Sequence, residues 1–398
     1  MKVYADNAAT TYLSETARTV LIDALDKYNG NPNSLHSDGQ LAKEKLEEAR
    51  QTVAKYINAK NANEIYFTSG GSEADNQALI SAAKGLKDKG KKHLITLSIE
   101  HHAILHTMAT LEKEGFEVTY LNPKSNGIVD VEDVRNALRE DTALVSVMFA
   151  NNEMGAIQPI PEIGALCKEK GVLFHTDAVQ ATAHLPIDVQ AMNIDMLSLS
   201  AHKFHGPKGV GVLYARNGIR LINIIEGGAQ ERGKRAGTIN VPGILSLAAA
   251  LKEACDNMEE NMNKVKALRD RLINGLKEIP YSKLNGDPVK RLPGNVNYSF
   301  EGVEGESLLL GLDREGICCS SGSACTSESL DPSHVLTGMG LPIELAHGSL
   351  RFSLDINNTE EEIDYIIEKV NQVVDRYREM SPLWEDLKTG KRQHYLPE

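Results

Sequence analysis

The sequence predicts an α/β fold, with a mostly parallel sheet sandwiched by helices and a second, smaller α+β domain. Three observations support this prediction. Strand-like and helix-like segments alternate from residue 64 to residue 215, as in parallel sheets whose strands are joined by crossover helices. The strand segments are continuous apolar runs, which is typical of strands buried on both faces. The chain has 398 residues, more than one ordinary hydrophobic core holds, so two domains are expected.

Each element of the larger domain is predicted from a local pattern of apolar residues. Helices are indicated where apolar residues recur at helical spacing, and strands where short apolar runs end at turn residues. The first helix is expected over residues 37–57, and a second carries Ala78 to Leu86. Further helices are expected over residues 102–114, 131–139 and 161–170, and strands over 64–68, 93–98, 117–121, 142–150, 172–178, 196–200 and 209–215.

The pattern changes in the last third of the chain. One long helical segment over residues 241–277 is expected to cross between the domains. A smaller α+β region follows, with strands over 294–300 and 350–355, a helix over 306–315 and a last helix that begins at the capping box of residues 359–362. The polar tail after Met380 is expected to be loose. The predicted boundaries are 13–255 for the large domain, and 256–398 together with 1–12 for the small one.

Composition excludes several classes of protein. Hydrophobic residues make up 41% and charged residues 25% of the chain, which is typical of a globular protein. The net charge of −12 argues against direct nucleic-acid binding, because phosphate binding needs a basic face. We find no apolar leader and no run of about 18 apolar residues, so no membrane association is expected. Five unevenly placed cysteines do not make a disulfide framework. We therefore expect a soluble, reduced, cytoplasmic protein.

Reactive groups follow four of the predicted strands, and in parallel sheets ligands bind beyond the carboxyl ends of the strands. The glycine-rich turn Ser69–Ser72 runs into a helix, so its backbone N–H groups suit an anion such as phosphate. His101 and His102 could serve in acid–base chemistry, ring stacking or metal binding. Taken singly, the turn is weak evidence and favours a simple helix cap, and the histidines are equally compatible with an ordinary surface position.

The other two strand ends carry charged side chains. Asp177 ends an apolar strand, where a carboxylate is costly unless a cation or a donor pairs with it, and Gln180 follows three residues later. Lys203 stands in the stretch Ser198–Gly209, where an amine at the mouth of a buried strand can become a nucleophile. A structural salt bridge and a surface lysine before a turn are the ordinary alternatives.

A single ligand accounts for all four strand ends. It would place a phosphate at Gly71 and Ser72, a protonated ring nitrogen at Asp177, a flat ring against His101 and an aldehyde at Lys203. Pyridoxal phosphate has all four of these groups, and enzymes that use it hold it through a lysine and an acidic partner of the ring nitrogen. The set of residues is much more specific than any of its members.

A cysteine-containing stretch in the smaller domain supplies a further candidate. Cys325 is surrounded by small polar residues, which suits an exposed loop and a nucleophilic thiol. Cys318 and Cys319 follow an apolar helix and are expected to be buried. A zinc site built from these three cysteines and His334 lacks the usual spacing of zinc ligands, so no metal site is predicted.

Taken together, these residues resemble the cysteine desulfurases of the NifS/IscS group, pyridoxal-phosphate enzymes of fold type I in the class V aminotransferase family. The matching segments occur in order along nearly the whole chain: residues 5–11 (ADNAATT), 30–36 (GNPNSLH), 100–103 (EHHA), 151–153 (NNE), 177–180 (DAVQ), 200–203 (SAHK), 231–238 (ERGKRAGT), 321–327 (SGSACTS) and 350–353 (LRFS). The SGSACTS run is similar to that of the group with a long cysteine loop. The chain departs from the family at Gly71-Ser72, where Ala-Thr is usual, and in its C-terminal tail.

The resemblance implies a role for each matching residue. Lys203 would hold the cofactor and move the substrate's α-proton, and His101 would stack on the ring and assist proton transfer. Cys325 would take the sulfur of L-cysteine as a persulfide, leaving alanine, and is expected to contact an iron–sulfur cluster on a partner transiently. Asn152, Arg351 and Asn33 would bind substrate, and the cofactor would be held by Gly71, Ser72, His101, Asn152, Asp177, Gln180, Ser200, His202, Lys203 and, from the partner subunit of a homodimer, Thr238.

Two other functions are weighed against this one. A selenocysteine lyase or another class V aminotransferase-type enzyme would share the cofactor residues without needing Cys325. An inactive adaptor for sulfur-carrier proteins would have a damaged cofactor set, and no expected residue is missing. The favoured function is L-cysteine desulfuration, with the sulfur passed to an iron–sulfur scaffold protein or another sulfur acceptor.

Overall fold

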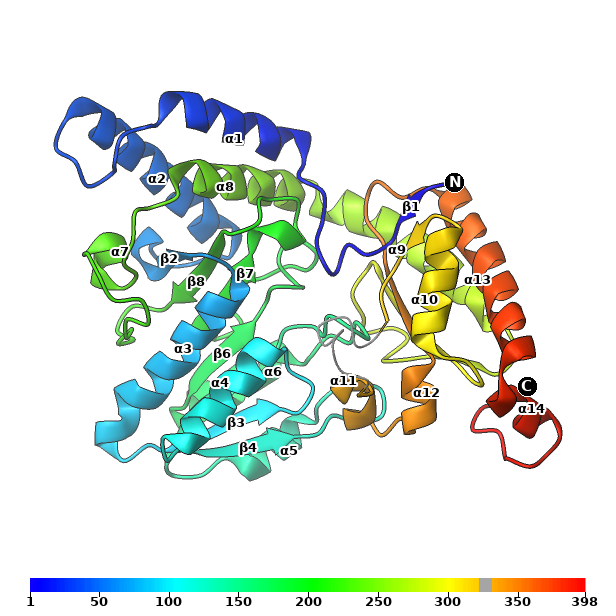
Figure 1. Cartoon of the computed structure of the whole chain (residues 1–398). Coiled ribbons are helices and arrows are strands. Elements are labelled where there is room, and N and C mark those ends of the chain that lie inside the picture. Colours follow the sequence, from blue (N-terminus) through cyan, green and yellow to red (C-terminus); the bar gives the residue numbers. More distant parts are fainter. Residues whose placement is uncertain (322–330, 398) are drawn as a thin grey trace.

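The computed structural model describes residues 1–321 and 331–397, so Cys325 lies outside the described residues. A seven-stranded sheet forms the centre of the larger part of the molecule (Figure 1). Its strands lie in the order β2 (Ile65–Thr68), β8 (Gly211–Ala215), β7 (Met196–Ser200), β6 (Leu173–Asp177), β5 (Thr142–Ser146), β3 (His93–Leu97) and β4 (Glu117–Leu121). All strand pairs are parallel except those that β8 makes with β2 and β7. The predicted mostly parallel sheet is confirmed.

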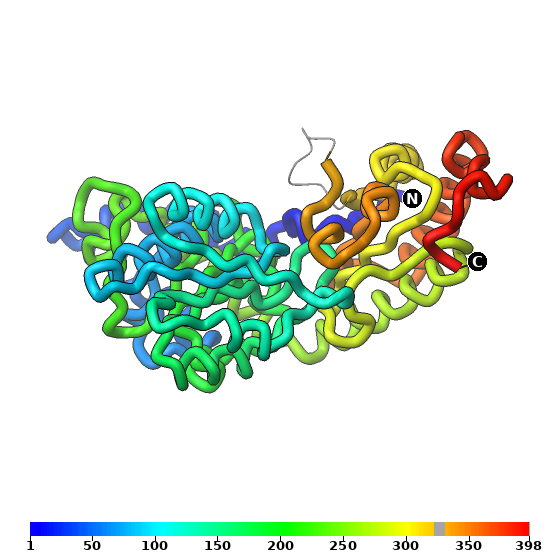
Figure 2. Tube along the Cα trace, turned by 90° about the horizontal axis from the view of Figure 1, so that it is seen from below, coloured from blue at the N-terminus to red at the C-terminus, as the bar shows by residue number. Residues whose placement is uncertain are grey.

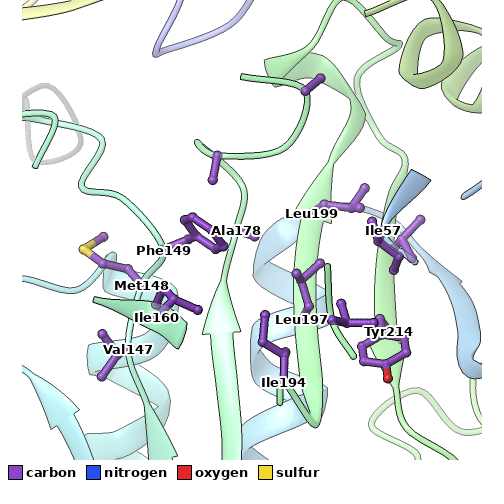
Figure 3. Close-up of a cluster of buried hydrophobic side chains, with 14 of the residues drawn as sticks. Ile57, Val147, Met148, Phe149, Ile160, Ala178, Ile194, Leu197, Leu199 and Tyr214 are labelled. Atoms are coloured by element: carbon purple, nitrogen blue, oxygen red, sulfur yellow. The ribbon is translucent and has the colours of Figure 1, made fainter. Parts of the chain in front are cut away.

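Helices cover both faces of this sheet because successive strand residues point to opposite sides. Leu94, Leu144 and Met196 pack on α3 and α4, while the next residues in each strand, Ile95, Val145 and Leu197, face the opposite core. Figure 3 shows part of this opposite core of the large sheet, around Leu197, Leu199 and Tyr214. The helices are α1 (Glu15–Lys27), α2 (Ser37–Tyr56), α3 (Gly71–Leu86), α4 (His102–Lys113), α5 (Val131–Ala137), α6 (Ile160–Lys170), α7 (Gln230–Gly233) and α8 (Val241–Asp256).

A separate core lies beside those of the large sheet, and we call the part of the chain built round it the small lobe. Its antiparallel sheet has the order β12–β10–β9, and β1 pairs in parallel with β11, so the N-terminus belongs to this lobe (Figure 2). The strands are β1 (Val3–Tyr4), β9 (Ser282–Leu284), β10 (Asn295–Phe300), β11 (Ile317–Cys318) and β12 (Ser349–Ser353), and the helices are α9 (Met258–Lys277), α10 (Gly305–Arg314), α11 (His334–Gly338), α12 (Ile343–His347), α13 (Glu360–Met380) and α14 (Pro382–Lys388). The domain boundaries at 13–255 and 256–398 stay a prediction.

The predicted single helix over residues 241–277 is wrong. The segment forms two helices, α8 and α9, with Asn257 at the break between them. Asparagine competes with the helix backbone for hydrogen bonds and therefore favours helix ends. Helix α8 contributes Leu247 and Leu251 to the core of the large sheet, whereas α9 contributes Leu268 and Leu272 to the small lobe. The break lets the chain leave one core and enter the other.

The expectation of a loose tail after Met380 is also wrong. Residues Pro382–Lys388 form α14, and the chain then folds back onto the small lobe. The buried carboxylate of Glu301 accepts hydrogen bonds from the Tyr395 backbone N–H at 2.7 Å and from His394 Nδ1 at 3.1 Å. The guanidinium of Arg378 lies 4.3 Å from the centre of the Trp384 ring. A buried acid anchors this tail, a contact that the polar composition of the segment does not reveal.

Membrane spans were sought among the described helices. None of them combines the length and the apolar character needed to cross a bilayer.

Candidate active site

A cleft of about 890 Å³, part of it open to solvent, lies where the strand ends of the large sheet meet the small lobe. The turns after β2, β6 and β7 supply one wall, and the N-terminal segment and β12 supply the other. The lining residues include ten of the predicted site residues: Gly71, Ser72, His101, Asn152, Asp177, Gln180, Ser200, His202, Lys203 and Arg351. The structure therefore gathers at one place residues that are spread over 281 positions, from 71 to 351.

The N-terminus of α3 forms one end of the cleft. Its first backbone N–H groups have no acceptor within the helix and carry the positive end of the helix dipole. Gly71 packs closely against the turn after β6, since a Cβ atom at this position would lie 2.7 Å from Val179 Cγ2. The hydroxyl groups of Ser72 and Ser200 line the same cleft. This end has the backbone, the small residues and the hydroxyls that an anion such as phosphate requires.

His202 lies beside this anion site in neutral form. Its Nδ1 is 3.1 Å from Thr10 Oγ1. Burial, with smaller contributions from the charges of Lys203 and Lys208, lowers the pKa of His202 to about 4. At neutral pH the ring therefore acts as a hydrogen-bonding group and adds no positive charge.

Asp177 lies at the end of β6 and is buried. Its Oδ1 accepts the backbone N–H of Val179 at 2.9 Å. Burial raises the pKa of Asp177 to about 6, although the Val179 hydrogen bond and the charge of Lys203 oppose the shift. A cation bound against Asp177 would offset the burial and keep the carboxylate ionised. This is the environment that a protonated ring nitrogen requires.

A second carboxyl group, Asp75, lines the same cleft from α3. Its Oδ1 has no hydrogen-bond partner within the described part of the chain. Burial, followed by the charge of Asp177, raises the pKa of Asp75 well above its usual value. His175 Nε2 lies 3.7 Å from Asp75, but burial lowers the pKa of His175 to about 3, so this contact is not an ion pair. Of the two acids, Asp177 is the one available to balance a cation.

His101 is the N-cap of α4, and its Nδ1 accepts the backbone N–H of Ala103 at 3.1 Å. Burial lowers the pKa of His101 to about 4, with a smaller contribution from the charge of Lys203. The neutral ring therefore has its proton on Nε2, because Nδ1 is occupied as an acceptor. His101 cannot take up a second proton without giving up the helix cap. Its geometry favours stacking and donation from Nε2.

Lys203 extends from the short turn Ala201–Lys203 that follows β7. Its Nζ donates to the carbonyl oxygens of Ala8 at 2.6 Å and Ala9 at 2.8 Å. Gln180 Nε2 donates to the same Ala8 oxygen at 3.0 Å. The N-terminal segment thus holds the amine at the cleft beside Asp177 and Gln180.

Arg351 reaches the cleft from β12 of the small lobe and is buried. Its Nη1 donates to Asn152 O at 3.0 Å and its Nη2 to Asp6 Oδ1 at 3.0 Å. Nε, by contrast, has no partner within residues 1–321 and 331–397. An unpartnered N–H on a buried guanidinium suits a carboxylate ligand.

Two predicted residues are not brought to this cleft. Asn33 is exposed between α1 and α2, and Thr238 is exposed after α7; neither lines the cleft of its own chain. Their assigned roles stay predictions. Cys325 lies outside the described residues, but the chain on either side is attached near the cleft. Ser320 exchanges two backbone hydrogen bonds with Arg351, at 3.0 and 2.7 Å, and His334 Nε2 lies 3.0 Å from Glu100 O.

The other four cysteines are all described, and none forms a disulfide. Burial raises the pKa of Cys167 and of Cys255 to about 12, and it also raises the pKa of Cys319. Protonated thiols of this kind are poor nucleophiles. No group of three His, Cys, Asp or Glu side chains among the described residues is arranged to hold a metal ion.

Three contributors to the site were missed by sequence reasoning. Asp6 orients Arg351, the backbone oxygen of Ala8 accepts Lys203, and Asp75 lines the cleft. A signal existed for Asp75, since it interrupts the apolar face that α3 presents to the core. No signal existed for the Ala8 oxygen, because every residue has a carbonyl group.

The residues present fit pyridoxal phosphate. The N-terminus of α3 lies beside the hydroxyl groups of Ser72 and Ser200 in the cleft, and Asp177 is a buried acid that a bound cation would keep ionised. Lys203 and His101 line the same cleft as these two groups. The donor set therefore matches the phosphate, the ring nitrogen, the ring face and the aldehyde of one molecule.

Comparison with known proteins agrees with this site. Residues 3–366 match the aminotransferase class-V family. The chain is 56% identical over 395 residues to cysteine desulfurase IscS of Clostridium botulinum, covering 98% of this chain and 99% of that one. Among solved structures, a NifS-like protein superposes with a TM-score of 0.88 at 38% identity, covering 94% of this chain and all of that one. The structure described as SspA in complex with cysteine has a TM-score of 0.80 at 35% identity, covering 90% of this chain and 100% of its own. The chain therefore belongs to the class-V aminotransferase family of pyridoxal-phosphate enzymes, in its cysteine desulfurase group.

Proposed function

We propose that this enzyme removes the sulfur atom of L-cysteine, releases L-alanine and keeps the sulfur on Cys325 as a persulfide. The observation that carries the proposal is the single cleft that holds Lys203, Asp177 and His101 on one wall and Arg351 on the other. It is supported by the similarity to cysteine desulfurases and to a related structure in complex with cysteine.

Bound pyridoxal phosphate withdraws electrons from the substrate's Cα, which makes the α-proton and the Cβ–S bond labile. The chain's own residues carry out the remaining tasks. Asp177 keeps the ring nitrogen protonated, and the cradle at Gly71, Ser72, Ser200 and His202 binds the phosphate. Arg351 Nε, which has no partner among the described residues, binds the substrate carboxylate. This fixes Cα opposite the Lys203 amine, which takes the α-proton.

The sulfur step conserves atoms and electrons. The Cys325 thiolate attacks the substrate sulfur, a new S–S bond forms, and the Cβ–S bond breaks with its electron pair moving to carbon. A proton then completes the methyl group of alanine. Support for Cys325 comes from its two flanks, which attach near Arg351 and Glu100, and from the raised pKa of three of the other four thiols.

The partners follow from the same chemistry. A persulfide on Cys325 needs an acceptor, and we propose an iron–sulfur scaffold protein or another sulfur-accepting protein. We also propose a homodimer in which Thr238, exposed and outside its own cleft, completes the phosphate site of the partner subunit. A cytoplasmic location remains the prediction made from the sequence.

Mass spectrometry of Cys325 after treatment with L-cysteine tests the proposal. We expect a mass increase of one sulfur atom on the peptide that contains Cys325, with one alanine released. Cys325→Ser should keep the cofactor and form no persulfide, whereas the control Cys255→Ser should behave like the wild type. Desulfuration by Cys325→Ser at an undiminished rate would show that Cys325 is not the acceptor and would favour a lyase.

A further inference from the structure

His205 and Asp355 form a contact that neither the predicted chemistry nor the cofactor site includes. His205 stands two residues after Lys203, and Asp355 two residues after β12. His205 Nε2 lies 3.1 Å from Asp355 Oδ1, and His205 Nδ1 lies 2.9 Å from the carbonyl oxygen of Tyr12. Both side chains are largely shielded, with 13% and 11% of their surfaces exposed.

The hydrogen bonds fix the charge of this pair. A carbonyl oxygen only accepts, so Nδ1 must carry a proton. Asp355 accepts from Asn357 Nδ2 at 3.2 Å through one oxygen and faces His205 through the other, and its pKa is lowered by the His205 hydrogen bond and charge against the effect of burial, so the carboxylate is ionised at neutral pH. Nε2 must then donate too, and a ring that donates from both nitrogens is an imidazolium ion. The pair is therefore a shielded ion pair.

Neighbouring groups agree with this assignment. Burial acts to lower the pKa of His205, but the hydrogen bond and charge of Asp355 outweigh it and the net pKa is raised. Burial acts to raise the pKa of Asp355, and His205 reverses the shift so that it is lowered. Two further titratable groups face the pair, Glu253 towards His205 and His184 towards both.

The contact connects three segments of the active site. His205 has φ +64°, a left-handed conformation that is costly for a residue with a side chain. Its N–H donates to Thr11 Oγ1 at 2.8 Å, and its carbonyl oxygen accepts from Ser14 N at 3.0 Å. The same N-terminal segment supplies the Ala8 and Ala9 oxygens that hold Lys203. Asp355 ties all of this to β12, the strand that carries Arg351.

We propose that the His205–Asp355 ion pair is a positioning device that fixes the Lys203 turn relative to the strand bearing Arg351. The proposal rests on the proposed function of Lys203 and Arg351. With the pair intact, the amine and the carboxylate-binding guanidinium keep the separation that places Cα of the substrate at Lys203. Among the described residues, the other hydrogen bonds of His205 go to Thr11, Tyr12 and Ser14 of the N-terminal segment.

The test uses the holoenzyme with three substitutions: Asp355→Asn, His205→Asn and the two together. Asparagine tolerates a left-handed conformation, so His205→Asn preserves the turn. We expect kcat to fall about tenfold or more in each variant, because small displacements of reacting groups cost this much, with unchanged cofactor content and a smaller change in KM. In Asp355→Asn the deficit should grow with rising pH, since His205 then loses its proton nearer neutrality.

The double substitution separates positioning from a direct electrostatic effect of the His205 and Asp355 charges on Lys203. It removes one positive and one negative charge and leaves the net charge unaltered. We expect it to shift the pH midpoint of the visible absorption band of the cofactor attached to Lys203, measured without substrate. His394→Asn is the matched control, because His394 makes a histidine–carboxylate contact of the same length, 3.1 Å, with Glu301 in the C-terminal tail. This control should leave kcat and the midpoint unchanged.

The outcomes can be told apart. If the three variants lose only thermal stability, while kcat, its pH profile and the midpoint stay those of the wild type, the pair is structural and the inference is overturned. If the wild type releases no alanine, the proposed function fails, and the absorption midpoint still decides whether the pair sets the environment of Lys203. Either single variant decides the question should the double variant fail to fold.

Discussion

Asp6 Oδ1 accepts a hydrogen bond from Arg351 Nη2 at 3.0 Å, so one terminal nitrogen of this guanidinium already has an anionic partner within the protein. The carbonyl of Asn152 holds Nη1 at the same distance, and Ser320 Oγ donates to the same Asp6 oxygen at 2.8 Å. The guanidinium is therefore fixed by the protein on two of its three nitrogens. Holding the guanidinium in one orientation lowers the entropy lost when a ligand binds to it.

Arg351→Lys tests whether the paired N–H donors of the Arg351 guanidinium bind the substrate carboxylate. Lysine keeps the charge and loses the paired donors, so we expect KM for L-cysteine to rise about tenfold or more. The same substitution should change little for cysteamine, which has no carboxylate. Steady-state kinetics with both substrates measure the difference, and Arg271→Lys, on the outside of the small lobe, is the control. Equal effects on the two substrates would argue against carboxylate binding.

Gly71→Leu tests the phosphate cradle. A Cβ alone would lie 2.7 Å from Val179 Cγ2, and alanine is usual at this position in the family, but the rest of a leucine side chain must displace α3 or the turn after Asp177. We expect cofactor affinity to fall about tenfold or more, as judged by absorbance titration of the apoenzyme. Gly85→Ala is the control on the same helix, because its Cβ would meet its nearest neighbour at an ordinary 3.6 Å. It should keep cofactor affinity and stabilise the helix by up to about 1 kcal/mol.

Asp177 should make cofactor binding depend on pH. Its pKa in the free protein is raised to about 6, and pairing with a ring cation lowers it again, so binding releases a proton below that pH. Affinity should therefore rise with pH up to about 6 and level off above. In Asp177→Asn affinity should be lower and the dependence should disappear. A titration of cofactor affinity from pH 5 to pH 8 would contradict the assignment if both proteins gave the same profile.

Lys203→Ala should abolish the attached cofactor's absorption band and lower activity by about 10² to 10⁴-fold, the range for a lost acid–base group. Reduction of the wild type with borohydride followed by peptide mapping should place the cofactor on Lys203. Lys208→Ala, five residues further along the same turn, is the control. Retention of the band by Lys203→Ala would assign the attachment to another residue.

The large sheet was predictable from sequence because its strands are long apolar runs with little polar interruption. The gathering of the proposed cofactor residues in one cleft was predictable because Ser72, His101, Asp177 and Lys203 each lie at or just after the end of a strand and are unusual side chains for that place. Contacts across the cleft could not be predicted from the sequence. Asp6 and Arg351 are 345 positions apart, and no local pattern marks one as the partner of the other. The break at Asn257 was missed because both halves of the segment carry the same helical spacing, although they face different cores.

His101 shows how a structure refines a predicted role. Its position after β3 suggested stacking and proton transfer equally. The hydrogen bond from Ala103 N–H to Nδ1 uses the lone pair that a base would need. We therefore expect Lys203 to move the α-proton, and the hydrogen bond that suggests this could not be inferred from residue types alone.

The pairing of β1 with β11 joins Val3 to Ile317 and Tyr4 to Cys318. During synthesis the first strand must therefore wait until more than three hundred further residues have left the ribosome. The seven-stranded sheet ends at residue 215 and can assemble in the meantime, but Asn7 and Ala8 can form their hydrogen bonds with Ser353 only after β12 has been made. The nascent protein thus forms its sheet early and completes the surroundings of the Lys203 amine last, so an incomplete chain is unable to begin the chemistry.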